Sequence, residues 1–243
     1  MNNYRQQDIE HVVKDRGLLY PIDVLVVGAA GTGKSSTINA LMNSAVAKVG
    51  EGADPETQMI SSHLLHKYLR FHDSAGLGDG LEADKRHSKA IIEKLCLPCT
   101  VNEQQYGFID LVLVILDGGS RDLGTAMQLL EHVVMKNISA DRVVVAINQA
   151  DAAMEGRHWR QHLKQPDYQL AQFLNQKAHL VQQRLRDGAG KTITLPICYS
   201  AYHGYQLAHL MDALIAQFPH QRRALPRKWF FGDKFACPKC TIC

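Results

Sequence analysis

The sequence predicts an α/β protein, a three-layer sandwich around a mainly parallel sheet. Three apolar runs, residues 24–27, 111–117 and 142–148, lack the alternation of half-exposed strands and are typical of parallel strands buried on both faces. Stretches with helical periodicity separate these runs, and a glycine-rich segment joins the first run directly to a helix. Strands that alternate with helices favour a parallel sheet covered by helices.

The same periodicities predict the remaining elements. Two consecutive strand-like runs, residues 59–65 and 68–72, are expected to pair in an antiparallel manner. The full predicted order is helix 9–18, strand 24–27, helix 36–42, strands 59–65 and 68–72, helix 81–95, strand 111–117, helix 125–135, strand 142–148, helix 167–185, strand 192–199 and helix 207–218.

Composition indicates a globular protein, with 46% hydrophobic and 21% charged residues among 243. We expect an N-terminal helical extension over residues 1–19, a main domain over 20–219 and a basic, aromatic and cysteine-containing tail over 220–243. The last 23 residues carry six Lys and Arg against one Asp, so the net charge of +3 belongs to the tail. No apolar run is long enough for a membrane span, and the N-terminus lacks the apolar core of a signal peptide, so a cytoplasmic location is expected.

The glycine-rich segment has the spacing Gly28-x-x-x-x-Gly33-Lys34-Ser35 of a phosphate-binding loop between a strand and a helix. Glycines let successive N–H groups turn inward towards an anion, and the helix start adds free donors. Lys34 can reach the β- and γ-phosphates, and the Ser35 hydroxyl can bind Mg²⁺. This predicts a nucleoside triphosphate site, with phosphate contacts from Gly28, Gly31, Thr32, Gly33, Lys34, Ser35 and Ser36.

A second motif, Asp73-x-x-Gly76, ends another predicted strand. Asp73 can hold Mg²⁺ through a water, because this cation prefers carboxylate oxygens and keeps several waters. The Gly76 N–H can approach the γ-phosphate, and Thr57 can complete the Mg²⁺ shell. On its own, this motif could equally be an ordinary turn.

Base recognition is assigned to the ends of the last two predicted strands. The Asp151 carboxylate can accept hydrogen bonds from the ring N–H and exocyclic amine of guanine, a pair that adenine lacks. Asn148 would tie this loop to the phosphate loop, Gln149 would lie at the base, and the Ser200-Ala201 backbone would donate to the guanine carbonyl. The alternative is that Asn148 and Asp151 are only turn residues.

These motifs, in this order, resemble a Ras-type P-loop G domain, and specifically the Era/TrmE-like bacterial GTPases and their YfjP/YeeP-like branch, over about residues 20–219. The resemblance implies binding of GTP and GDP with Mg²⁺, and hydrolysis in which Lys34, Thr57 and Gly76 act at the γ-phosphate. Thr57 and residues 73–80 would be switch segments that order around the γ-phosphate.

Three departures from the family pattern modify this expectation. Gln149 stands where the family has a lysine that covers the base, which predicts weaker binding. Leu77 replaces a water-orienting glutamine, so hydrolysis should be slow unless a partner protein or a homodimer supplies the missing group. Gly31 replaces the asparagine of potassium-dependent relatives, so stimulation by potassium is not expected. The alternatives are a guanine-nucleotide-binding interaction module with little turnover and, less favoured, a P-loop ATPase.

The cysteines and the tail raise separate hypotheses. Cys96, Cys99, Cys237 and Cys240 form two Cys-x-x-Cys pairs that could bind one Zn²⁺, or the first pair could simply be a buried helix end. The basic tail could bind RNA or the ribosome, although docking of its aromatic residues on the main domain is the favoured alternative.

Overall fold

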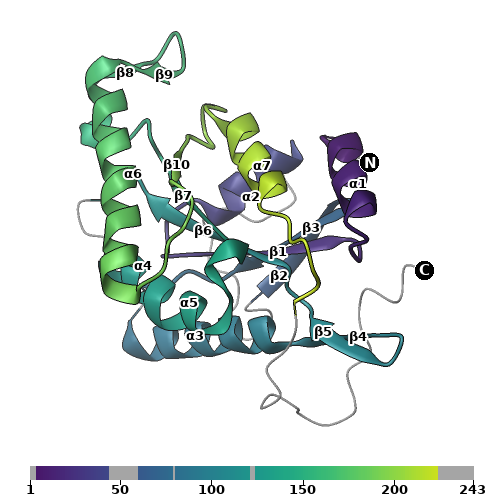
Figure 1. Ribbon diagram of the computed structural model, residues 1–243. Coiled ribbons are helices and arrows are strands. Elements are labelled where there is room, and N and C mark those ends of the chain that lie inside the picture. Colours follow the sequence, from purple (N-terminus) through teal and green to yellow (C-terminus); the bar gives the residue numbers. More distant parts are fainter. Residues whose placement is uncertain (1–3, 44–59, 79, 121–123, 224–243) are drawn as a thin grey trace.

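The computed structural model describes residues 4–43, 60–78, 80–120 and 124–223, and shows a six-stranded sheet between helices (Figure 1). The strand order is β10-β7-β6-β1-β3-β2. The pairs between neighbours are parallel except that of β2 with β3, which is antiparallel as predicted. The strands are β1 Ile22–Gly28, β2 Ile60–His66, β3 Leu69–Ser74, β6 Leu111–Asp117, β7 Val143–Asn148 and β10 Ile197–Cys198.

The register of the parallel strands brings their carboxyl ends to one edge of the sheet. Val26 pairs with Asp73, Gly28 with Ile115, and Asp117 with Asn148. Residues that follow β1, β3 and β7 in the chain therefore meet at this edge, where ligands of open α/β sheets bind.

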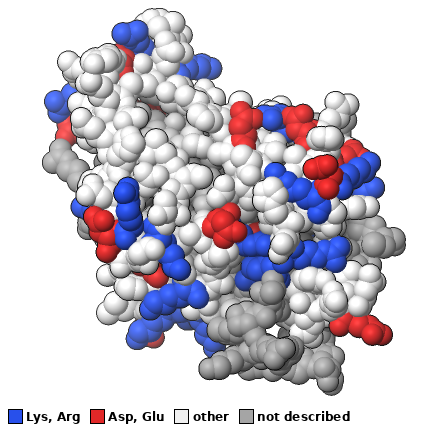
Figure 2. All heavy atoms as spheres, viewed as in Figure 1, with Lys and Arg blue, Asp and Glu red and all other residues white. Residues whose placement is uncertain are grey.

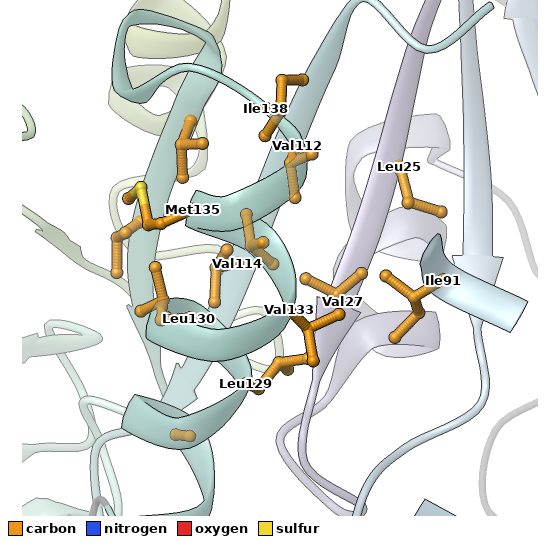
Figure 3. Close-up of a cluster of buried hydrophobic side chains, with 14 of the residues drawn as sticks. Leu25, Val27, Ile91, Val112, Val114, Leu129, Leu130, Val133, Met135 and Ile138 are labelled. Atoms are coloured by element: carbon orange, nitrogen blue, oxygen red, sulfur yellow. The ribbon is translucent and has the colours of Figure 1, made fainter. Parts of the chain in front are cut away.

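Helices cover both faces of the sheet, so the predicted three-layer sandwich is confirmed. On one face, α1 Gln6–Asp15, α2 Lys34–Met42 and α7 Leu207–Ala216 pack on a cluster that includes Ile9, Ile38 and Leu214. The other face carries α3 Leu81–Cys96, α6 Tyr168–Ala189 and a helix between them. Figure 3 shows Val27, Val112 and Val114 of this second core beside side chains of the middle helix.

The middle helix departs from regular α geometry. The predicted helix 125–135 consists of α4 Gly124–Gln128, a π-helical segment Leu129–Val134 and α5 Met135–Asn137. Leu129, Leu130 and Val134 are almost fully buried, so the wider turn still directs its apolar side chains into the core.

The predicted strand 192–199 was wrong over most of its length. Only Ile197 and Cys198 form β10, paired with Ala146 and Ile147. Thr192 and Thr194 are exposed, and Pro196 lacks the N–H that a ladder requires.

Two short hairpins were not predicted. One pairs β4 Pro98–Val101 with β5 Gln104–Gly107 across Asn102 and Glu103, which both have positive φ (48° and 66°). The other pairs β8 Trp159–Arg160 with β9 Gln165–Pro166. Both are too short and polar to show an apolar alternation. Among the described residues, no helix is long and apolar enough to cross a membrane.

Candidate nucleotide site

The phosphate loop lies where β1 gives way to α2. Gly31 and Gly33 have positive φ values of 76° and 84°, which glycine adopts without strain. A Cβ at Gly33 would lie 2.3 Å from Asn148 Nδ2. The loop therefore requires glycine at residue 33 both for its conformation and for its contact with the β7 end.

Lys34 lies over this loop with only 8% of its surface exposed. Its Nζ donates to the carbonyl oxygens of Gly28 (3.3 Å) and Ala29 (2.9 Å). Thr32 Oγ1 also donates to Ala29 O, at 3.0 Å. These contacts hold a positive charge at the helix start, where an anion is already favoured.

Ser35 and Asp73 form the candidate cation site. Ser35 Oγ donates to Asp73 Oδ2 at 2.6 Å, while Asp73 Oδ1 is buried without a hydrogen-bond partner among the described residues. Burial raises the pKa of Asp73, and the Ser35 hydroxyl and the Lys34 charge oppose this shift. A buried carboxylate oxygen with spare capacity fits Mg²⁺, which takes few protein ligands and completes its shell with waters and phosphates.

The segment after Asp73 extends the sheet across the phosphate loop. Ala30 N donates to Leu77 O at 2.6 Å, and Leu77 N donates to Gly28 O at 3.3 Å. A Cβ at Gly76 would lie 2.5 Å from Ala30 Cα, so only glycine fits there. His87 Nδ1 of α3 lies 2.7 Å from Gly76 O, which links this segment to the helix.

Asn148 joins three segments at the edge of the sheet. Its Nδ2 donates to Thr32 O at 2.9 Å, and its Oδ1 accepts from Ala201 N at 3.0 Å. Gln149 Nε2 donates to Gly31 O at 2.8 Å, so this side chain also spans to the phosphate loop. The structure thus places Asn148 and Gln149 against the loop, and Ala201 against Asn148. The Ala201 N–H, expected to donate to the base, is occupied by Asn148 in this conformation.

One carboxylate oxygen of Asp151 has no hydrogen-bond partner among the described residues. Its Oδ1 is buried and makes no hydrogen bond to any residue within the described ranges. Its Oδ2 lies 3.8 Å from His203 Nε2. An unpartnered buried acceptor is costly in a finished fold, and such groups mark sites where a ligand supplies the donor.

Two contributors were missed from the sequence. Lys177 of α6 donates from Nζ to the carbonyls of Asp117 (3.0 Å), Gly118 (2.7 Å) and Ser120 (2.7 Å), and so fixes the loop after β6. His203 follows Ser200-Ala201 closely, but a single histidine without ligand spacing gave no signal. Lys177 has no motif, because its role depends on the packing of α6.

Thr57, Cys237, Cys240 and the basic tail beyond residue 223 lie outside the described residues. Within the residues described, no three His, Cys, Asp or Glu side chains gather as a metal site, so Zn²⁺ binding stays a prediction. Burial raises the pKa of the Cys96 thiol, and Cys99 is 1% exposed.

Figure 2 shows Asp and Glu next to most groups of Lys and Arg on the face it displays.

Comparison with known proteins shows the family. Residues 23–149, just over half of the chain, match the family model described as 50S ribosome-binding GTPase. The tRNA modification GTPase MnmE of Sulfurovum sp. (strain NBC37-1) is 27% identical over 146 residues, which are 58% of this chain and 29% of MnmE. The chain thus spans less than a third of that relative.

Solved structures share the fold at low identity. Toc33 from Arabidopsis thaliana, in complex with GDP and Mg²⁺, has a TM-score of 0.61 and 13% identity, covering 91% of this chain and 93% of Toc33. A variant of Era from Aquifex aeolicus bound to GDP.AlF4⁻ has a TM-score of 0.53 and 16% identity, covering 84% of this chain and 59% of Era. At these identities the likeness shows the fold, which this chain shares with proteins solved with a guanine nucleotide.

Proposed function

Because the chain belongs to the 50S ribosome-binding GTPase family, we propose that it binds guanine nucleotides at the carboxyl edge of its sheet and slowly hydrolyses GTP to GDP. One observation carries the proposal. Asp73 bonds to Ser35 of the phosphate loop, and Asp151 follows Asn148 and Gln149, whose side chains bond to that loop; each of the two carboxylates keeps a buried oxygen without a hydrogen-bond partner among the described residues. Their surroundings match the two ends of a nucleotide, a phosphate-bound cation and a base.

The phosphate end is assigned to Lys34, Ser35 and the loop glycines. Lys34 Nζ already donates to the loop carbonyls, so only its acceptors need to change, from carbonyl oxygens to phosphate oxygens, when phosphate enters. Ser35 and Asp73 would hold Mg²⁺, which neutralises charge on the phosphates when bound. The Gly76 N–H and Thr57 are proposed at the γ-phosphate. Leu77 cannot orient water, so slow turnover is part of the proposal.

The finer assignments are also proposals. Four of them rest on the sequence alone: membership of the YfjP/YeeP-like branch, the domain limits 1–19, 20–219 and 220–243, a cytoplasmic location, and RNA or ribosome contact through the tail. A homodimer is supported by a related observation: dimerization is important for the GTPase activity of the chloroplast translocon components atToc33 and psToc159.

A direct test compares binding of GTP, GDP and ATP to the purified chain, with and without Mg²⁺, and then follows phosphate release. We expect GTP and GDP to bind at least roughly 100-fold more tightly than ATP, because a site built for guanine leaves its acceptors unpaired with adenine. The Lys34→Ala variant should lose triphosphate affinity.

The outcome also separates the alternatives. Equal affinity for ATP would overturn the guanine assignment and favour a P-loop ATPase. Tight GTP binding without measurable phosphate release, which Leu77 favours, would leave a guanine-nucleotide-binding interaction module.

A further inference from the structure

We infer that His203 is a positioning residue for guanine recognition, which holds the Asp151 carboxylate in the orientation that selects 2-amino-6-oxopurine nucleotides. This inference rests on the proposed function and adds a specificity element from outside the sequence motifs. The residue lies in the turn that follows β10, next to Ser200 and Ala201.

The turn that carries His203 is tightly closed. Ser200 and Tyr205 exchange two backbone hydrogen bonds, each of 3.1 Å, and His203 N donates to Ser200 Oγ at 3.2 Å. Because Ser200 is fully buried, this turn is anchored in the body of the protein. The imidazole therefore starts from a fixed backbone position.

Aromatic contacts fix the ring itself. The ring centroids of Trp159 and His203 are 5.1 Å apart. The ring of Tyr202 packs edge-on against the His203 imidazole, with centroids 4.7 Å apart. Trp159 also packs edge-on against Tyr205 at 5.6 Å. Trp159 comes from the β8–β9 hairpin, where it pairs with Pro166, so the hairpin supports the imidazole from outside the sheet.

The held imidazole faces one oxygen of Asp151. The distance of 3.8 Å between His203 Nε2 and Asp151 Oδ2 exceeds a direct hydrogen bond, so the restraint that we infer passes through a bridging water. The side chain of His203 is 9% exposed and that of Asp151 is 21% exposed, so solvent weakens this contact only in part. Asp151 Oδ1 has no partner among the described residues and is left for a ligand.

This arrangement has a consequence for specificity. Two in-plane hydrogen bonds from guanine require a fixed carboxylate plane, whereas one bond tolerates rotation. Inosine nucleotides keep the ring N–H and lack the 2-amino group. Loss of the restraint should therefore weaken GDP binding more than IDP binding.

The test measures the affinities of GDP and IDP for the full chain and its His203→Ala variant. We expect the variant to lose about tenfold in GDP affinity and less than about threefold in IDP affinity, in line with one charge-assisted hydrogen bond made poorly. His203→Gln, which keeps a donor, should recover part of the GDP/IDP ratio. His162→Ala, at the exposed tip of the same hairpin, serves as the matched control.

Each result decides the question. An unchanged ratio, whether both affinities fall together or neither falls, would overturn the positioning role. A Trp159→Phe variant should also lower the ratio of GDP affinity to IDP affinity. Combining it with His203→Ala should lower this ratio no further than His203→Ala does alone, because both substitutions act through one contact. If the unmodified chain binds neither GDP nor GTP, the proposed function itself fails before this comparison begins.

Discussion

The two ends of the sheet treat buried charge in opposite ways. At the carboxyl ends of the strands, Asp73 meets a neutral hydroxyl and Asp151 meets an imidazole at 3.8 Å. At the amino ends, Asp23 is fully buried, and its Oδ1 accepts from Arg70 Nε at 2.6 Å and lies 2.7 Å from His72 Nε2. Within the described ranges, one end keeps carboxylates without a Lys or Arg in contact, and the other supplies the cation from the chain.

This difference separates binding from folding. A buried ion pair takes its counter-charge from the protein itself, so removal of one partner leaves the other with its desolvation penalty uncompensated. A buried carboxylate without a cation destabilises the unliganded fold, and the ligand recovers that energy. Substitutions at the two ends should therefore affect different properties: stability at the amino end and nucleotide binding at the carboxyl end.

The largest effect is expected from Asp23→Ala at the amino end. It leaves the partly buried Arg70 and the buried His72 without their carboxylate, which should lower the free energy of unfolding by roughly 3–5 kcal/mol. Urea unfolding followed by circular dichroism measures the loss. A stability within about 1 kcal/mol of the unmodified chain would show that the two ends do not differ in this way.

Asp151→Asn should act on the ligand and spare the fold. The amide offers one acceptor and one donor, so guanine loses a partner and GDP affinity should fall roughly 100-fold. Xanthine carries an oxygen where guanine carries the amine, so XDP should bind better to the variant than GDP does. Calorimetric titration with both nucleotides gives the comparison, and thermal unfolding without ligand should stay close to that of the unmodified chain.

Gly76→Ala sharpens the comparison within the carboxyl end. A methyl group would collide with the Ala30 backbone, so the segment must move away from the phosphate loop. We expect phosphate release to slow by about tenfold, because one backbone donor near the γ-phosphate is misplaced. GDP affinity, which does not depend on that donor, should change less than about threefold. Equal losses in both would contradict this assignment.

The smallest effect concerns pH and His72. Burial lowers the pKa of His72, although Asp23 opposes the shift; Arg70 and Lys94 also face the ring and favour its neutral form. The unfolded chain therefore binds more protons than the folded chain below about pH 6.5, and stability should fall as pH falls through that range. His72→Gln should flatten this dependence. Burial also lowers the pKa of His66, so the difference between the two unfolding curves is the quantity to measure.

The sequence allowed more predictions for the carboxyl edge of the sheet than for the amino edge. The phosphate loop is one short continuous segment, and the spacing of its glycines, Lys34 and Ser35 is enough to predict a phosphate-binding loop. Asp73, Asn148 and Asp151 could be predicted as residues of one site because parallel strands bring their carboxyl ends together. All of these depend on a few residues next to each strand end.

Other features depend on tertiary packing that spacing does not encode. The contact of His72 with Asp23 has no motif in the sequence, because it arises only from the pairing of β1 with β3. His203 matters because the β8–β9 hairpin, too short to show a pattern, places Trp159 against it. The strand expected at residues 192–199 failed because apolar composition does not show which residues find a ladder partner.

Because Ala30 N already donates to Leu77 O, a phosphate bound at Ala30 would compete with the protein's own backbone. Any phosphate that needs the Ala30 N–H must take it from the Leu77 carbonyl, and the peptide that is released belongs to the segment that His87 ties to α3. Binding of such a phosphate would then replace one backbone hydrogen bond with a ligand contact and loosen the segment that bonds to His87 of α3. A protein that contacts α3 would sense occupancy without ever touching the nucleotide.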